Sequence, residues 1–99
     1  EDINFLYINY MFFNKLLVEF IGTTFFCYII LVVGNPYAIC AALLIAILLG
    51  GNISGGMYNP AVSLMMTTAG KLKISEFGPY ILSQLFGALA AFHLSKIKL

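Results

Sequence analysis

Three apolar segments, each long enough or nearly long enough to cross a lipid bilayer, constrain the fold of this chain more than any other feature. They cover about residues 16–33, 37–51 and 77–94, and a membrane-spanning helix needs about 20 mainly apolar residues. Residues 34–36 (Gly-Asn-Pro) predict a helix break, because proline has no amide donor and glycine and asparagine favour turns. The sequence therefore predicts an all-α integral membrane protein that crosses the lipid bilayer several times.

The composition and charge exclude several classes of function. Of the 99 residues, 62% are hydrophobic and 9% are charged, compared with about 25% charged residues in a soluble domain. A net charge of +1 gives no attraction to nucleic acid. The sequence contains no Ser–His–Asp set, no group of metal ligands and no phosphate-binding loop. We therefore expect neither an enzyme nor a cofactor nor a metal site.

The chain divides into a short N-terminal segment and one membrane unit. Tyr7 and Tyr10 precede the first span and suit the aromatic belt at a membrane interface. We therefore expect residues 1–14 to be an N-terminal interfacial segment and residues 15–99 to form the membrane unit. Tyr80, near the start of the third span, is expected in the same belt, just after a proline that suits the first turn of that helix.

A polar segment of residues 52–70 separates the second and third spans and admits two interpretations. It is either a loop outside the membrane or a re-entrant segment, in which irregular backbone enters the membrane and a half-helix leads back out. Irregular backbone at membrane depth must be buried by protein or reached by water, and the glycines, asparagines and serines of the segment suit such a place. Asn59 is a good helix N-cap, and Pro60 fits the first helical position. A half-helix is therefore expected over residues 60–69, ended by Gly70.

Lysines lie near both ends of the membrane unit. Lys71 and Lys73 follow the half-helix, where positive charge suits the negative end of a helix dipole, and this favours the re-entrant interpretation. Three spans place the termini on opposite sides of the membrane, so Lys15 falls on the side of Lys71 and Lys73. Lys96 and Lys98 fall on the other side. Three lysines against two is a weak positive-inside bias, which is compatible with insertion in both orientations.

Three short motifs occur in order along the chain: EFIGT at residues 19–23, SGGMYNPAV at residues 54–62 and SQLFGA at residues 83–88. They resemble the first-helix motif, the first signature loop and the third-helix motif of the aquaporin and glycerol-facilitator family, the major intrinsic proteins. The resemblance covers about residues 15–95. It implies the N-terminal half only, because a complete member has six spans and two half-helices with the Asn-Pro-Ala triplet, related as an inverted repeat. The implied fold is three transmembrane helices plus one re-entrant half-helix.

The resemblance also implies roles for particular residues. Asn59, Pro60 and Ala61 form the central constriction, where the asparagine side chain donates hydrogen bonds to the passing solute. Glu19 and Gln84, which are polar residues inside the first and third spans, brace the re-entrant loop. A carboxylate inside a membrane is costly and often functional, so a proton relay is the alternative role for Glu19. Backbone carbonyls from about residue 51 to residue 57 lead to the constriction, and the candidates for this ladder are Gly55, Gly56, Met57 and Tyr58.

Two residues of the chain depart from the family pattern. Met57 stands where the signature loop usually has histidine, and Val62 follows the triplet where the second triplet of the family is usually followed by arginine. Alignment to the family places Ile39 at its second-helix filter position. Ile39 of one copy and Val62 of another are therefore candidates for an apolar selectivity filter at each mouth.

These features predict a passive channel for water or small neutral solutes such as glycerol. A single Asn-Pro-Ala triplet supplies half of a pore, so two oppositely inserted copies are expected to pair as an antiparallel dimer, and four such dimers could form a tetramer of pores. A separately encoded C-terminal half is another expected partner. The alternative is a non-conducting, truncated or regulatory membrane subunit that associates with full-length relatives.

Overall fold

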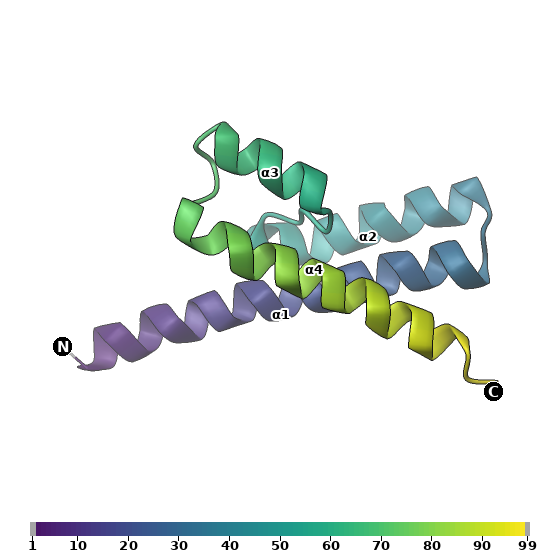
Figure 1. Cartoon of the computed structure of the whole chain (residues 1–99), viewed down its shortest axis with the longest axis horizontal. Coiled ribbons are helices and arrows are strands. Elements are labelled where there is room, and N and C mark those ends of the chain that lie inside the picture. The colour runs from purple at the N-terminus through teal and green to yellow at the C-terminus, as the bar shows by residue number, and fades with distance from the viewer. Residues whose placement is uncertain (1, 99) are drawn as a thin grey trace.

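The computed structural model describes residues 2–98, and helices form most of them. The helices are α1 (Asp2–Val32), α2 (Pro36–Ser54), α3 (Pro60–Thr68) and α4 (Ile74–Ser95) (Figure 1). By length and composition, α1, α2 and α4 can each cross a membrane, whereas α3 has only nine residues. The predicted fold class is therefore confirmed: the described residues form three long apolar helices, with one short helix between the second and the third.

Helix α1 begins much earlier than the predicted first span. It runs unbroken from Asp2, because the segment up to Val32 contains no proline and only one glycine, Gly22. Residues 2–14 are thus the first part of α1, and at 1.5 Å per residue its 31 residues reach about 46 Å. Nearly all of residues 2–14 are exposed. Their place at the membrane interface stays a prediction, and the predicted outer boundaries, residues 1 and 99, lie outside the described residues.

The turn between α1 and α2 follows from its sequence. Gly34 has a φ of +71°, a left-handed conformation that glycine adopts readily. Asn35 is the N-cap of α2, and its side-chain oxygen accepts hydrogen bonds from the amides of Tyr37 at 2.8 Å and Ala38 at 3.3 Å. Pro36 occupies the first turn, where its missing donor costs nothing. The helix break predicted at these residues is confirmed.

The start of α4 corrects two expectations. The helix begins at Ile74, so Pro79 lies inside it and not in its first turn. Gly78 has no Cβ to clash with the proline ring, which removes one steric cost of a proline inside a helix, and Pro79 leaves the carbonyl of Ser75 without its helical donor. Tyr80 is not in an interfacial belt: it is 1% exposed, and its hydroxyl donates to the carbonyl of Ser54 at 2.7 Å. A buried tyrosine hydroxyl needs such a partner.

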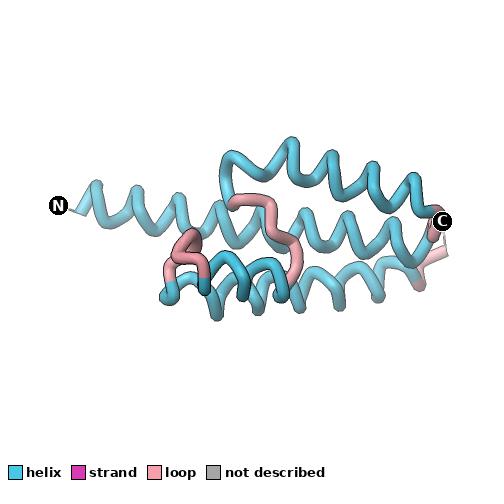
Figure 2. Tube along the Cα trace, turned by 90° about the horizontal axis from the view of Figure 1, so that it is seen from above, coloured by secondary structure: helices cyan, strands magenta, loops and turns pink. Residues whose placement is uncertain are grey.

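Helix α1 is the centre of the arrangement. Helices α2 and α4 both pack against it, and α3 packs against α4 (Figures 1 and 2). Small residues allow the close approach, with Ala42, Ala46 and Gly50 buried on α2 and Gly87 on α4. A Cβ at Gly87 would lie 2.8 Å from the carbonyl oxygen of Phe20 on α1. Membrane helices commonly associate through small residues in this way.

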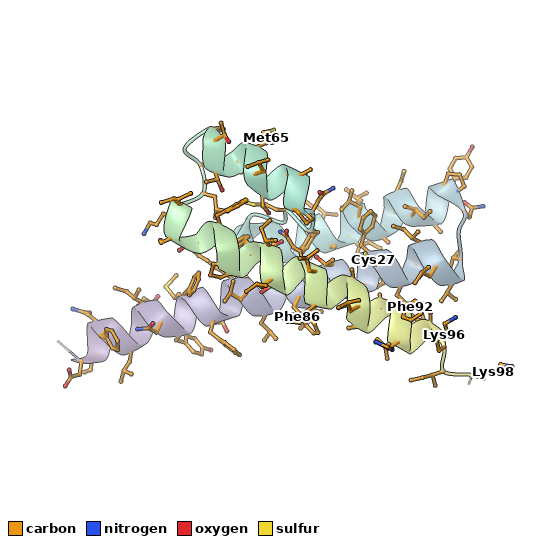
Figure 3. The ribbon with its side chains drawn as sticks, viewed as in Figure 1. Cys27, Met65, Phe86, Phe92, Lys96 and Lys98 are labelled. Carbon is orange, nitrogen blue, oxygen red and sulfur yellow. The ribbon has the colours of Figure 1, made fainter. Side chains whose placement is uncertain are left out.

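The outer surface is largely apolar, and several of the buried side chains are polar. Met65 on α3 lies on the outer side of the structure, and Lys96 and Lys98 lie at the C-terminal end, with Lys96 over the ring of Phe92 (Figure 3). The N-terminus is at the opposite end of the long axis (Figure 1). The fully buried side chains include Glu19, Ser63 and Gln84. This distribution suits a chain that is surrounded by lipid.

Candidate functional site

The N-terminus of α3 is open at the surface of the structure. Asn59 is its N-cap, with extended backbone, and the side-chain oxygen accepts a hydrogen bond from the amide of Ala61 at 2.8 Å. Asn59, Pro60 and Ala61 are all exposed, and no acceptor within residues 2–98 bonds the side-chain amide of Asn59. Two amide donors and the positive end of a helix dipole therefore face the same open space. In Figure 1, α3 starts near the middle of the bundle and runs back towards the start of α4.

The loop between α2 and α3 directs three successive amide N–H groups to the interior. The amide of Met57 donates to Oε2 of Glu19 at 3.0 Å, and the amide of Tyr58 donates to Oε1 of the same carboxylate at 2.7 Å. The amide of Gly56 donates to Oγ of Ser54 at 3.2 Å. Left-handed backbone at Gly56 (φ +63°) and Tyr58 (φ +53°) makes this unusual arrangement of amides possible. The loop is thereby attached to α1 at two consecutive residues.

The carbonyl groups of the loop point away from Glu19. In a trans peptide the C=O points opposite to the N–H, so the carbonyls of Gly55, Gly56 and Met57 are directed away from the acceptors of the amides that follow them. No donor within residues 2–98 reaches these carbonyls or that of Tyr58. Residues 51–54 form the last turn of α2, and the carbonyls of residues 51 and 54 are not free, because the first accepts from the amide of Gly55 and the second from the hydroxyl of Tyr80. That helix ends only at Gly55, whose φ is +93° and whose amide donates to the carbonyl of residue 51.

Glu19 is the centre of a buried polar network. The carboxylate is 0% exposed and accepts four hydrogen bonds. Besides the two loop amides, Oγ of Ser54 donates at 2.7 Å and Nε2 of Gln84 donates at 2.9 Å. Two carboxylate oxygens offer about four acceptor positions, and all of them are filled. This set of partners joins α1, α2, α4 and the loop, so Glu19 and Gln84 have the contacts that a bracing role requires, and each neighbour of the carboxylate acts as a donor.

Gln84 extends the network to α3. Its Nε2 also donates to Oγ of Ser63 at 2.7 Å, and Ser63 is 0% exposed. Two buried atoms nearby, Oε1 of Gln84 and Oγ1 of Thr23, have no hydrogen-bond partner among the described residues. Neither Ser54 nor Ser63 is among the predicted site residues. Both are hydroxyl residues in mainly apolar segments, and this contrast is the sequence signal that could identify them.

Met57 and Val62, the two departures from the family pattern, belong to one apolar cluster. Met57 is buried in a cluster with Leu72 and Tyr80, and Val62 lies half-buried against that cluster. Ile39 is half-buried in the first turn of α2. Within the described residues, α2 and α3 make no contact with each other, so one chain does not bring Ile39 and Val62 together. A shared filter would need the two residues to come from different copies.

One end of the bundle carries a polar hollow of about 330 Å³. Lys15, Lys71 and Lys73 line it together with residues from the end of α2. Lys15 also forms an ion pair of 3.6 Å with Glu76 of α4. The three lysines predicted to share one side of the membrane therefore lie at one end of the structure. No three His, Cys, Asp or Glu side chains among residues 2–98 are placed to hold a metal ion.

Comparison with known proteins gives one consistent result. The family model described as "Major intrinsic protein" matches residues 6–98. Aquaporin-8 of Mus musculus is 39% identical over 94 residues, which covers 82% of this chain and 35% of that protein. Aquaporin Z of Brucella melitensis is 38% identical over 93 residues, covering 79% of this chain and 41% of the relative. Aquaporin-8 of Rattus norvegicus is 48% identical over 61 residues, covering 62% of this chain and 22% of the relative. The chain thus spans well under half the length of these relatives, and no solved structure matches it.

Proposed function

The chain belongs to the major intrinsic protein family, and on that basis we propose that it supplies half of a passive transmembrane channel for water or small neutral solutes such as glycerol. It is an integral membrane protein that crosses the bilayer more than once, and its family is one of channels, not of enzymes. We also propose that two copies pair in opposite orientations, because a single chain leaves hydrogen-bonding groups at the start of α3 without partners.

The exposed start of α3 carries this proposal. Non-helical backbone at membrane depth must be covered by protein or reached by water, because lipid offers no hydrogen-bond partners. The loop carbonyls of Gly55, Gly56, Met57 and Tyr58, and the side-chain amide of Asn59, have no partner within residues 2–98. In a lone chain the exposed groups among them, at Gly55 and Asn59, would face hydrocarbon. A second copy related by a two-fold axis in the membrane plane would place two such surfaces face to face around a file of water.

In this pore each group has a defined task. The amide of each Asn59 donates to the solute, the carbonyls of Gly55 to Tyr58 accept from it, and the positive ends of the two α3 helices repel cations. Glu19 and Gln84 hold the loop in place from behind. Ile39 of one copy and Val62 of the other narrow each mouth with apolar side chains. Such pores could assemble further into a tetramer.

Osmotic swelling of vesicles that contain only this chain tests the function. We expect faster water flow than in empty vesicles, and loss of that flow in Asn59→Asp. Aspartate keeps the N-cap of α3, since Asn and Asp cap about equally well, so the variant removes the two amide donors and leaves the start of the helix intact. Asn35→Asp is the matched control, because Asn35 also caps a helix before a proline, at the far end of the bundle. Absence of swelling would favour the non-conducting subunit.

Membrane topology tests the pairing. In an antiparallel dimer, a tag at the C-terminus must be reachable from both sides of the membrane, because the C-terminus lies at one end of each chain and the two copies are inserted in opposite orientations. Labelling of the tag from one side only would exclude this dimer. A separate C-terminal half or a full-length relative would then be the partner.

A further inference from the structure

The side chain of Tyr58 is held in a socket between α1 and α2. Tyr58 is 3% exposed, and its backbone is left-handed (φ +53°), which costs a bulky residue free energy that its surroundings must supply. The socket is made by glycines: a Cβ at Gly22 on α1 would overlap ring carbons of Tyr58, and a Cβ at Gly50 on α2 would overlap its hydroxyl oxygen. Both helices therefore leave space for this one ring.

Hydrogen bonds fix both ends of Tyr58. Its hydroxyl donates to the carbonyl oxygen of Ala46 on α2 at 2.6 Å, and its amide donates to Glu19 on α1 at 2.7 Å. Within residues 2–98, helix α2 does not pack its backbone closely against α3 or α4, and its tie to α4 is the hydrogen bond from the hydroxyl of Tyr80 to the carbonyl of Ser54. Tyr58 is thus a direct link between the α1–α2 pair and the loop that leads into α3. The next residue along the chain is Asn59, the proposed donor of the constriction.

From this geometry we propose that Tyr58 is a positioning residue that sets the width of the constriction and thereby the choice of solute. The inference rests on the channel function proposed above. The ring fixes the distance of the loop from α1 and α2. This distance in turn sets how far the side chain of Asn59 extends into the path of the solute through the pore. Removal of the hydroxyl frees one end of the ring, so the constriction no longer has a single width.

The ratio of glycerol flow to water flow tests this inference. Tyr58→Phe is expected to change the ratio about fivefold, the factor that corresponds to one typical hydrogen bond of about 1 kcal/mol. A substitution that only destabilises the fold reduces the number of working pores, and it therefore lowers the water flow and the glycerol flow by the same factor. Tyr80→Phe is the matched control, because it also removes a buried hydroxyl that donates to a backbone carbonyl, and we expect it to leave the ratio unchanged. An unchanged ratio in Tyr58→Phe overturns the proposal.

A rescue experiment tests the socket without relying on conduction. The measurement is hydrogen exchange at the amides of Met57 and Tyr58, which we expect Gly22→Ala and Gly50→Ala each to accelerate. Tyr58→Phe removes the hydroxyl that a Cβ at Gly50 would meet and leaves the nearest ring carbon 3.4 Å from that Cβ, so it should restore part of the protection to Gly50→Ala, while Cγ1 of Val18, 2.6 Å from the same Cβ, still has to shift. It should not rescue Gly22→Ala, whose Cβ meets ring carbons that phenylalanine retains. The overlap of a Cβ at Gly50 with Val18 is the same whether the ring carries a hydroxyl or not.

The two measurements separate the two proposals. If the native chain conducts nothing, the channel proposal fails, while selective rescue of Gly50→Ala still supports Tyr58 as the residue that positions the loop. If the chain conducts but both glycine variants respond alike to Tyr58→Phe, the positioning role is refuted and the channel proposal stands.

Discussion

Replacement of Glu19 by glutamine should loosen the loop at a predictable cost. Each carboxylate oxygen accepts one loop amide and one side-chain donor: Oε1 from Tyr58 and Gln84, and Oε2 from Met57 and Ser54. Glutamine keeps one acceptor oxygen and replaces the other with a donor NH₂. Whichever oxygen is lost, one buried backbone amide loses its acceptor.

The side-chain partners can adapt, but the backbone amides cannot. The hydroxyl of Ser54 can turn towards the carbonyl of Gly50, 3.5 Å away, and Gln84 can rotate its unpartnered Oε1 towards the new NH₂. An unpartnered buried amide costs about 1–3 kcal/mol, and hydrogen bonds to a charged group contribute about 1.5–3 kcal/mol each. With one amide orphaned and the other bonded to a neutral oxygen, we expect Glu19→Gln to lower the free energy of unfolding by about 2–5 kcal/mol.

Unfolding by a denaturing detergent in mixed micelles, followed by circular dichroism, measures this loss. Glu76→Gln is the control with the same change of atoms. Glu76 forms an ion pair with Lys15 of 3.6 Å, in which both side chains are partly exposed, so its loss should cost less than about 1 kcal/mol. Hydrogen exchange at the amide of Met57 or Tyr58 should be faster in Glu19→Gln than in the native chain, and it should be unchanged at both amides in Glu76→Gln. The reasoning is refuted if Glu19→Gln is as stable as Glu76→Gln and both amides stay protected.

Two glycine substitutions should change stability in opposite directions. Gly70→Ala should destabilise the chain by about 1–2 kcal/mol, because the φ of Gly70 is +77°. Gly51→Ala should stabilise it by about 0.5–1 kcal/mol, because Gly51 is helical and the added Cβ would lie 3.8 Å from Ile47. Thermal unfolding should therefore show a lower unfolding temperature for the first variant and a higher one for the second, and a shift in the same direction for both would contradict the backbone argument. Val62→Arg should lower glycerol flow relative to water in the swelling assay, because it places a charged group at each mouth. If the ratio of glycerol flow to water flow is unchanged in this variant, Val62 is not part of the filter.

Local sequence rules predicted the N-cap at Asn59 and a helix break at residues 34–36, and the same capping rule also applies at Asn35. Asn35 and Asn59 both cap a helix with Pro at its first position, because capping depends only on the next few residues. The fold class followed from the lengths of the apolar segments. Pro79 was misplaced because the rule for proline in a first turn took no account of Gly78 before it, and Tyr80 was misplaced because a tyrosine near a span end is usually interfacial.

The socket of Tyr58 could not be predicted from the sequence. Gly22 and Gly50 lie 36 and 8 residues before Tyr58, on two different helices, and only their packing shows that both are needed by one ring. The contact of Glu19 with the loop was expected only through the family resemblance. Caps and turns depend on neighbouring residues and can be predicted locally, whereas the surroundings of a buried ring or carboxylate depend on residues from distant segments.

The order of the donors around Glu19 has a consequence for biogenesis. Translation makes α1 first, so its carboxylate meets the bilayer before Ser54, the loop amides or Gln84 exist. Three of its four hydrogen bonds come from residues 54–58 and the last from α4. A bare carboxylate in a membrane costs about 2.5–3.5 kcal/mol. We therefore expect nascent chains arrested after the loop has left the ribosome to keep α1 inserted in a larger fraction of molecules than chains arrested before α2 is complete.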